Sequence, residues 1–537
     1  MTDHASTAIV GEGNSRETVA IIGAGPAGLT AAYLLSKAGT PVTVLEADPE
    51  NVGGISRTVQ HRSAAAGGGT FRFDIGGHRF FSKSREVEDL WTELLGDEML
   101  VRPRKSRILY GGRFYSYPLS AIEAVNNLGL AEAVRCVASY ARARALPIAN
   151  PRSFEDWVTN QFGRRLYGIF FKTYTEKVWG IDCREISADW AAQRIKGLSL
   201  STAIWNAIVP RRRTADRSRQ IKTLLDSFRY PRLGPGMMWE AAAESTRRQG
   251  GEIRLGCRVT GLERLPESSA RPRGAWRVAC TDASGRDDVV EATHVISSAP
   301  LRQVVHGLSP ALPAAARAAA TQLKYRDFIT VALIVRPSIP LDDNWIYIHD
   351  PGVKVGRVQN FRSWSPDLVP DPALACYGLE YFCFEGDGMW ESADAELVAM
   401  AGRELAALGL ARESDVIDGC VVRQPKAYPV YDEHYAGHVA TIRSAVEAHC
   451  PNLHLVGRNG MHKYNNQDHA MMTAMLTVRN ILAGRQVHDV WNVNQDAEYH
   501  EAGDRGAESQ LAGGLAGSSQ AAGGLRDVPR RVTPTGR

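Results

Sequence analysis

Residues 18–37 read TVAIIGAGPAGLTAAYLLSK, and this stretch decides the fold class. Its first five residues form a short apolar run that favours a β-strand. Three glycines follow in the order GxGxxG, and helix-forming residues continue from Leu29 to Lys37. A second strand-like run, residues 41–45, ends at the acidic residue Glu46. The pattern predicts a strand, helix, strand unit that binds a dinucleotide.

Each glycine of the motif has its own physical reason. Gly23 allows the tight turn after the strand, Gly25 lets backbone N–H groups approach a pyrophosphate, and Gly28 lets the helix pack closely on the strand. The N-terminus of the helix then favours the anionic phosphates. Glu46 is placed to accept hydrogen bonds from the ribose hydroxyls, which argues against a 2′-phosphate. We therefore expect FAD or NAD rather than NADP as the tightly bound cofactor.

Two further segments narrow the choice of cofactor. The run GGISRT at 53–58 follows the acidic residue within one loop, and LHLVGR at 453–458 is a short strand before a helical segment. The first resembles the second phosphate contact of the glutathione-reductase-like flavoproteins, and the second resembles their segment that closes over the flavin. This resemblance implies FAD as the cofactor. The resemblance also implies four further cofactor-binding residues, namely Gly54, Arg57, Gly457 and Arg458.

The composition bounds the class of protein. The 537 residues are 44% hydrophobic and 23% charged, with a net charge of only +4, so neither nucleic acid nor an anionic membrane is favoured as a partner. The eight cysteines form no CxxC pair and no Cys/His cluster at zinc spacing, and we expect no metal. The apolar stretch at 19–35 is interrupted by glycines and a proline, which argues against a secretory signal or a membrane span. We expect a cytoplasmic protein, and its oligomeric state stays open.

The pattern along the chain predicts an α/β protein. We expect a Rossmann-like FAD-binding domain of the glutathione-reductase type, an inserted helical domain and an antiparallel β substrate domain. The predicted ranges are a disordered leader at 1–16, FAD-binding segments at 17–119, 228–300 and 426–490, a mainly helical insertion at 120–227, a β-sheet substrate domain at 301–425 and a disordered tail at 500–537.

Four later blocks resemble those of the flavin-dependent UDP-galactopyranose mutases, especially the eukaryotic type. They read FDIGGHRFF at 73–81, YSYPL at 115–119, FKTYTEKVWG at 171–180 and NQDH at 466–469. The chain also resembles the wider protoporphyrinogen-oxidase and amine-oxidase branch, which shares the glycine motif but not these blocks. The resemblance to the mutases runs discontinuously from about residue 19 to residue 484.

The resemblance to the mutases implies roles for individual residues. His78 matches the histidine beside the flavin ring, and Arg194 and Arg357 match two arginines that hold the diphosphate of the sugar nucleotide. Asn466 and Gln467 belong to the cofactor-binding set. Paired guanidiniums suit a diphosphate because each offers planar, permanently charged donors. Aromatic residues implied at the substrate are Tyr117, Trp179, Trp345, Tyr347 and Tyr464, whose hydroxyls and flat rings bind without charge.

The activity implied is that of a mutase that interconverts pyranose and furanose forms of a nucleotide-linked sugar. In the family, N5 of the reduced flavin is the covalent catalyst and there is no net redox change; NAD(P)H is a possible electron donor. Leu119, Ser120 and Thr175 depart from the family pattern at positions that contact uracil, so the base and the sugar stay open. An FAD-dependent oxidoreductase of the amine-oxidase or protoporphyrinogen-oxidase kind is the alternative, and a flavin-containing sugar-nucleotide sensor is a third hypothesis.

Overall fold

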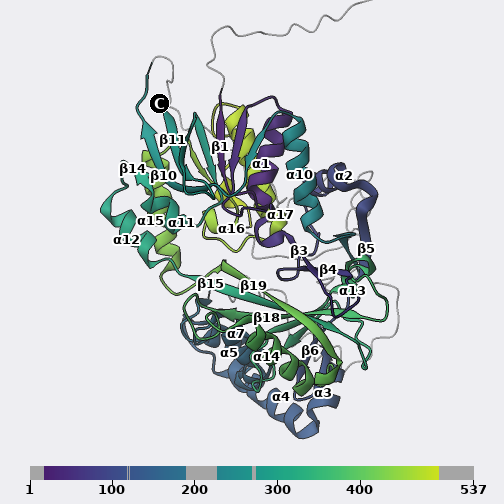
Figure 1. Cartoon of the computed structure of the whole chain (residues 1–537). Coiled ribbons are helices and arrows are strands. Elements are labelled where there is room, and N and C mark those ends of the chain that lie inside the picture. Colours follow the sequence, from purple (N-terminus) through teal and green to yellow (C-terminus); the bar gives the residue numbers. More distant parts are fainter. Residues whose placement is uncertain (1–16, 118, 120, 189–226, 269–273, 495–537) are drawn as a thin grey trace, which may run out of the picture.

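The computed structural model describes residues 17–117, 119, 121–188, 227–268 and 274–494, and it has two main parts (Figure 1). The upper part in Figure 1 is built on a parallel sheet, and the lower part is built on a larger, mainly antiparallel sheet. The predictions for the leader at 1–16 and the tail at 500–537, and part of the prediction for the helical insertion, lie outside the described residues.

The predicted dinucleotide unit is confirmed. Strand β1 (Val19–Ile22), helix α1 (Pro26–Lys37) and strand β2 (Val42–Leu45) follow one another, and β1 pairs in parallel with both β2 and β13 (His294–Ser297). The sheet has the order β20-β13-β1-β2-β9, with β20 at Leu453–Leu455 and β9 at Glu252–Arg254. All its pairs are parallel. The sheet therefore gathers segments from both ends of the chain.

Alternate residues of β1 face two hydrophobic layers, as the period of a strand requires. Val19 and Ile21 pack against a layer of helices, whereas Ala20 and Ile22 pack against a second layer on the other face. The first layer contains α1, α2 (Arg85–Leu95), α10 (Gly236–Arg248) and α17 (Gln467–Leu482). The second contains α11 (Leu301–His306), α12 (Ala314–Gln322), α15 (Tyr435–His449) and a sheet of β10 (Arg258–Leu265), β11 (Ala275–Thr281), β12 (Asp287–Ala292) and β14 (Leu308–Ser309).

The lower part is built on a seven-stranded sheet in the order β19-β15-β18-β17-β16-β6-β7. Its neighbours pair antiparallel, except that β16 pairs in parallel with β6. The strands are β6 (Ser106–Tyr110), β7 (Arg113–Ser116), β15 (Tyr325–Val335), β16 (Trp345–Ile348), β17 (Arg357–Asn360), β18 (Ala375–Cys383) and β19 (Val416–Pro429). Helix α14 (Asp394–Ala407) packs on one face, and short elements that include α13 (Phe361–Trp364) pack on the other.

The predicted domain boundaries differ from the structure at two places. Strands β6 and β7 lie within the range 17–119 predicted for FAD binding, yet they form the edge of the lower sheet. Helices α11 and α12 lie within the range 301–425 predicted for the substrate domain, yet they pack against the parallel sheet. In both cases the partners are distant in sequence, so neither packing contact leaves a local signal.

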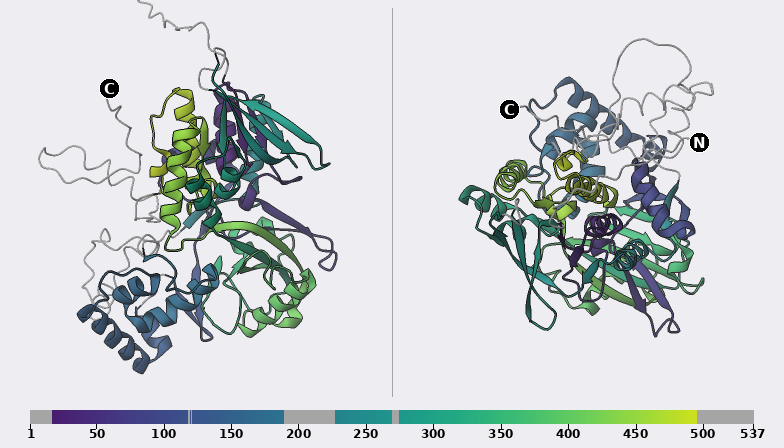
Figure 2. Two further views of the ribbon diagram at one scale, coloured as in Figure 1. Left: turned by 90° about the vertical axis from the view of Figure 1, so that its left-hand side faces the viewer. Right: turned by 90° about the horizontal axis from the view of Figure 1, so that it is seen from above.

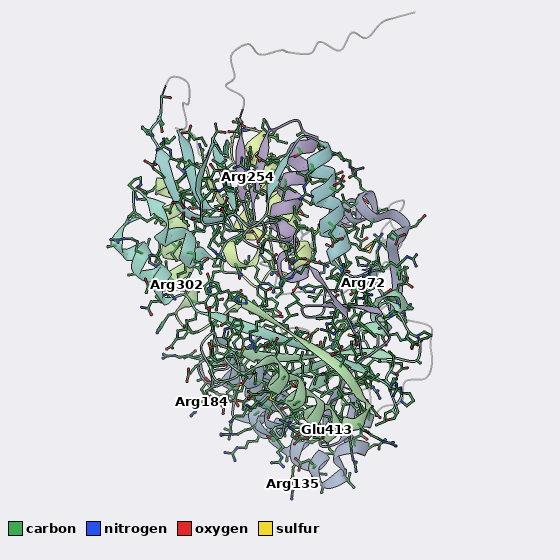
Figure 3. All side chains as sticks on the ribbon, viewed as in Figure 1. Arg72, Arg135, Arg184, Arg254, Arg302 and Glu413 are labelled. Carbon is green, nitrogen blue, oxygen red and sulfur yellow. The ribbon has the colours of Figure 1, made fainter. Side chains whose placement is uncertain are left out.

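The helical insertion is observed over its described residues. It comprises α3 (Ala121–Leu128), α4 (Leu130–Ala145), α5 (Phe154–Phe162), α6 (Arg164–Tyr167), a π-helical turn η3 (Gly168–Lys172) and α7 (Thr173–Trp179). In the left view of Figure 2 these blue helices lie beside the green sheet. Figure 3 shows Arg135 and Arg184 at the outer surface of this lower part and Arg302 on the upper part.

No helix among the described residues is long and apolar enough to cross a membrane.

The two parts are connected by β-ribbons as well as by helices. Strands β3 (Thr58–Arg62) and β4 (Thr70–Asp74) form one antiparallel pair, and β5 (Met99–Pro103) and β8 (Ser227–Pro231) form another. After β4 the chain continues through FDIGGHRFF at 73–81, which brings this predicted block to the junction of the two sheets.

Candidate cofactor and substrate site

Two glycine turns face each other at the N-terminus of α1. Gly25 caps the helix with φ −81° and ψ −174°, and a Cβ atom built on it would meet nothing within 4 Å. The turn at 53–54 lies opposite, because a Cβ on Gly54 would stand 3.5 Å from Gly25 Cα. The Gly53 N–H donates to the Ala24 carbonyl at 2.8 Å. The open space beside Gly25, at the N-terminus of α1, suits the close approach of a pyrophosphate.

The other two glycines of the motif serve packing within the chain. A Cβ on Gly28 would lie 1.8 Å from the Gly23 carbonyl oxygen, so only glycine lets the helix approach the strand. Gly23 has φ +95°, and a Cβ there would lie 2.4 Å from Ser298 Oγ. The structure thus separates one glycine that faces open space from two that contact protein.

The predicted ribose and phosphate contacts lie beside this space. Glu46 directly follows β2, and its carboxylate accepts the Ala24 N–H at 2.6 Å and the Asp48 N–H at 2.9 Å. Arg57 follows the second glycine turn, and its guanidinium donates to the Gly54 carbonyl at 3.4 Å. These bonds hold both side chains against the glycine turns and orient them for a cofactor.

A segment from the C-terminal part of the chain closes the same site. Gly457 starts α16 (Gly457–Gly460), and a Cβ on it would lie 3.1 Å from Ala27 Cβ in the first helix. Arg458 donates to the Asn465 carbonyl at 2.9 Å, and its guanidinium lies 5.0 Å from the ring centre of Tyr428 and 5.2 Å from that of Tyr464.

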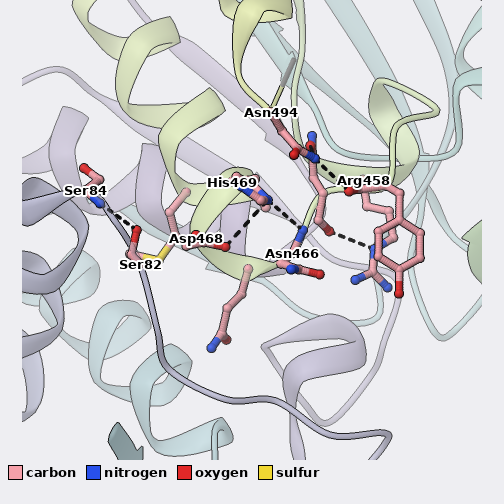
Figure 4. Close-up of polar contacts among 12 residues, drawn as sticks. Ser82, Ser84, Arg458, Asn466, Asp468, His469 and Asn494 are labelled. Atoms are coloured by element: carbon pink, nitrogen blue, oxygen red, sulfur yellow. Dashed lines mark hydrogen bonds and ion pairs between the residues drawn. The ribbon is translucent and has the colours of Figure 1, made fainter. Parts of the chain in front are cut away.

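The start of α17 adds two predicted residues, and Figure 4 shows Asn466, Asp468 and His469 together there. Asn466 is the N-cap of the helix, and its N–H lies 3.3 Å from His469 Nδ1. Gln467 donates to the Arg79 carbonyl at 3.0 Å. This hydrogen bond joins the start of α17 to the histidine-containing block at 73–81, so residues that are distant in sequence meet at one place.

His78 lies between two guanidiniums in this site. Its Nδ1 atom is buried and has no hydrogen-bond partner among the described residues. Burial lowers the pKa of His78 to about 3, and the positive charges of Arg458 and Arg357 lower it in the same direction. The imidazole is therefore neutral at physiological pH, with one buried nitrogen available to a group placed beside it.

We expect His78 to resist protonation well below pH 6.5. In the unfolded chain its pKa is near 6.5, so between pH 6.5 and about 3 unfolding takes up a proton at this residue, and its contribution lowers stability as the pH falls. Histidine labelled with ¹³C should give a His78 resonance, identified by its loss in His78→Gln, that does not titrate between pH 5 and 8. A midpoint near 6.5 would contradict this environment.

Arg357 is held by a buried carboxylate. It stands on β17 opposite Glu380 on β18, and its Nε donates to the Glu380 carboxylate, which also accepts from the Gln359 amide. Glu380 is fully buried, whereas the Arg357 side chain is 21% exposed. Burial alone would lower the pKa of Arg357, but Glu380 and the surrounding tyrosines raise it. The guanidinium is thus charged, and Nε is fixed while the outer nitrogens make no hydrogen bond to a described residue.

Aromatic side chains surround Arg357. Tyr347 lies opposite it in the register of β16 and β17. Its ring centre is 5.0 Å from that of Tyr117 and 5.5 Å from that of Tyr174 on α7. Trp345, two residues earlier on β16, lies 6.2 Å from Tyr347. Tyr117, which follows β7, and the predicted aromatic residues of β16 therefore form one group beside the arginine.

Two of the predicted residues need separate comment. Trp179 is only 3% exposed and packs in a core cluster beside Tyr431 and Tyr464, so its position favours packing over direct contact with substrate. Arg194 lies outside the described residues, and its role stays a prediction.

Three side chains of this site were missed by the sequence reasoning. Tyr174 lies within the quoted block at 171–180, and this block is the sequence signal that could have indicated it. In the structure Tyr174 packs against Tyr347, and burial raises the pKa of Tyr174. Tyr428 stacks on Tyr464 at 5.6 Å, and Glu380 pairs with Arg357. The last two lie on strands with no motif, and only the sheet register shows them. No group of three metal-binding side chains occurs among the residues placed by the structure.

The sequence model of the flavin-containing amine oxidoreductase family matches residues 26–482 of this chain. The match covers both sheets apart from strand β1, and it covers the described residues of the site apart from those of the glycine turn before Pro26. It extends from the first residue of α1 to the last residue of α17.

Solved structures show a similar fold. The crystal structure of reduced UDP-galactopyranose mutase has a TM-score of 0.73 at 21% identity, covering 90% of this chain and 100% of that one. A putative protoporphyrinogen oxidase from Exiguobacterium sp. 255-15 has a TM-score of 0.64 at 18% identity, covering 88% and 100%. Cyclohexylamine oxidase from Brevibacterium oxydans IH-35A has a TM-score of 0.58 at 17% identity, covering 87% and 100%. At these identities the likeness shows the fold alone.

Curated relatives match over shorter stretches. The dTDP-fucopyranose mutase of Escherichia coli is 29% identical over 177 residues, which are 32% of this chain and 44% of that protein. The putative oxidoreductase YgfK of Escherichia coli (strain K12) is 53% identical over 45 residues, 8% of this chain and 4% of that protein. The chain thus aligns with less than half the length of either relative.

Proposed function

Because this chain belongs to the flavin-containing amine oxidoreductase family, we propose that it is an FAD-dependent mutase that interconverts the pyranose and furanose forms of a nucleotide-linked sugar. The residues would hold FAD between the glycine turns at 23–28 and 53–54, with Glu46 toward the ribose and α16 and α17 closing the flavin end. When bound and reduced, FAD supplies a nucleophile, and the overall reaction involves no net oxidation.

The observation that carries this proposal is the setting of Arg357. A diphosphate brings negative charge into a partly desolvated site, and a guanidinium is the side chain best suited to bind it in a planar, two-pronged manner. Glu380 accepts from Nε, and the outer nitrogens make no hydrogen bond to a described residue.

The remaining residues orient the substrate and keep its surroundings constant. The hydroxyls of Tyr347 and Tyr117 can hydrogen-bond phosphate oxygens without adding charge. His78 stays neutral, so it adds no further positive charge beside Arg357 and Arg458. In this proposal the protein therefore contributes binding and orientation, and the cofactor contributes the chemistry.

The names of two similar proteins support the substrate class. UDP-galactopyranose mutase and dTDP-fucopyranose mutase both take a sugar linked to a pyrimidine nucleotide through a diphosphate, by their names. The shared part of these substrates is what Arg357 fits. We therefore propose UDP- or dTDP-linked hexoses, with NAD(P)H as a candidate electron donor and the cytoplasm as the site of action.

Binding of the nucleotide tests the substrate class directly. The flavoprotein should bind UDP or dTDP with a change in the flavin absorbance spectrum, and free sugars and simple amines should not produce that change. Isothermal calorimetry on the same samples measures the affinity. Failure to bind either nucleotide at millimolar concentration would remove the proposed substrate class.

The alternative function is an FAD-dependent oxidoreductase, which the family itself and the fold of cyclohexylamine oxidase favour. It predicts flavin reduction by the substrate and reoxidation by oxygen or another acceptor. Oxygen uptake with a panel of amines, unaffected by loss of Arg357, would support this alternative over the mutase.

A further inference from the structure

Lys177 reaches from α7 into the loop that joins two strands of the site. Its Nζ donates to the backbone carbonyls of Ile348 at 3.4 Å, Asp350 at 2.5 Å and Val355 at 3.2 Å. An ammonium has three N–H donors and no acceptor, so each can serve one carbonyl. The single ammonium group of Lys177 thus hydrogen-bonds carbonyls at both ends of the loop at 349–356.

This loop carries the two residues on which the proposed substrate site depends. Tyr347 is the residue before Ile348 at the end of β16, and Arg357 begins β17 directly after the loop. The two face each other in the register of the strands. A change in the width of the loop would therefore move the tyrosine relative to the guanidinium.

The loop is held from its other side as well. The Glu404 carboxylate on α14 accepts the N–H of Lys354 at 2.7 Å and that of Val355 at 3.0 Å. Carbonyls of the loop therefore meet a cation, and amides meet an anion. Lys177 on α7 and Glu404 on α14 have opposite charges, and each hydrogen-bonds the backbone of the loop at 349–356. The loop is therefore restrained from both helices.

Lys177 is itself fixed on the sheet. Arg326 on β15 donates to the carbonyls of Val178 at 3.2 Å and Phe382 at 2.7 Å, and it thereby anchors the end of α7 to β18. One turn before Lys177, Tyr174 lies edge-on to Tyr347 at 5.5 Å and stacks on His349 at 4.9 Å. The helix that carries the lysine thus contacts the substrate tyrosine independently.

We infer that Lys177 is a positioning residue that sets the distance between Tyr347 and Arg357 by holding the loop at 349–356, and so governs the affinity for the nucleoside diphosphate. The inference rests on the proposed function, because it assigns the two positioned residues to substrate binding.

The charge on Lys177 gives this role a pH signature. Burial lowers its pKa to about 8, against the opposing influence of Glu404 and Asp350. His349, which also faces the lysine, is held neutral because burial lowers its pKa to about 3, and Arg326 keeps its charge on the far side of α7. Loss of a proton above about pH 8 leaves two donors for three carbonyls, so nucleotide affinity should fall there.

The same shift separates positioning from general stability. The free lysine has a pKa of 10.5, so the buried charge costs folding free energy below pH 8, and this cost is relieved as the pH rises toward 10.5. Lys177→Met relieves this cost but leaves three carbonyls without their donor, so these opposing effects should leave the melting temperature near pH 7 little changed. A loss of affinity without a loss of stability would be specific to the loop.

The test compares Lys177→Met and Lys177→Arg with Lys172→Met in the FAD-loaded protein. Lys172 is the matched control, because it lies five residues earlier, is about half exposed and forms an ion pair with Glu176 at 3.9 Å. Hydrogen exchange of peptides that cover residues 345–357 reports on the loop. Calorimetric titration with UDP and with dTDP from pH 6.5 to 9.5 reports on binding.

Lys177→Met should exchange faster at 345–357 than Lys172→Met and bind the nucleotide about 10–100-fold more weakly at pH 7. Lys177→Arg should restore binding and remove the decline above pH 8, because a guanidinium keeps its charge there. Unchanged exchange would overturn the inference, and so would faster exchange with unchanged binding. A wild type that binds neither nucleotide refutes the proposed function and, with it, the effect on affinity; the exchange data still show whether Lys177 holds the loop.

Discussion

Replacing Gly25 by valine should give a folded protein that does not retain flavin. The backbone at Gly25 has φ −81°, which any residue adopts, and a Cβ there meets no protein atom within 4 Å. A valine side chain would instead fill the space between the two glycine turns, where backbone N–H groups must approach the pyrophosphate. We expect the purified variant to be colourless, with far-UV circular dichroism like that of the wild type.

The control for this prediction is Gly437→Val. Gly437 lies in α15, and a Cβ on it also meets nothing within 4 Å. This variant therefore tests the same substitution away from the two glycine turns of the cofactor site. It should stay yellow. Gly28→Ala should misfold, because its Cβ would lie 1.8 Å from a carbonyl oxygen. A yellow Gly25→Val protein with one flavin per chain would contradict the cofactor site described above.

Replacing Arg357 by alanine should weaken binding of UDP or dTDP by about 2–5 kcal/mol, the range for truncating one partner of a buried, hydrogen-bonded charge pair. Two effects contribute: the diphosphate loses its guanidinium, and Glu380 is left buried without its cation. Calorimetry measures the loss. The double variant Arg357→Ala with Glu380→Gln removes the second effect, so it should recover stability but not affinity.

A matched control exists two strands from β17 in the same sheet. Arg107 on β6 pairs with Asp343, which is fully buried, in a two-pronged contact at 2.8 and 2.5 Å. Arg107→Ala should destabilise the protein by a comparable route and leave nucleotide affinity unchanged. Equal losses of affinity in Arg107→Ala and Arg357→Ala would show that the effect comes from stability alone. Arg194→Ala extends the test to the other predicted arginine.

The part of the fold that sequence predicts well is local. Gly23, Gly25 and Gly28 lie within six residues, and the strand and helix that flank them follow from periodicity, so the unit and its role could be derived without any partner. The resemblance to the mutases, carried over residue by residue, then implies roles for Arg357 and Tyr347. The structure places these two residues opposite each other.

The part that sequence does not reveal depends on long-range register. Glu380 meets Arg357 only because β17 and β18 pair as they do, and Lys177 meets the loop at 349–356 only because α7 packs on that sheet. A buried glutamate in an apolar strand and a lysine on a helix have no local pattern that marks a role. The same limit explains why nothing local in β6 and β7 indicates their place at the edge of the seven-stranded sheet.

The central claim is that the reduced flavoprotein changes the ring size of a nucleotide-linked sugar. It is tested most directly by incubating the protein without oxygen, either reduced with dithionite or left oxidised, with UDP-galactopyranose and dTDP-fucopyranose, and separating the ring isomers by chromatography. We predict conversion of at least one substrate in the reduced sample only, and its loss in Arg357→Ala. The claim would be contradicted if a nucleotide sugar that binds is not converted, and if an amine reduces the flavin and oxygen reoxidises it.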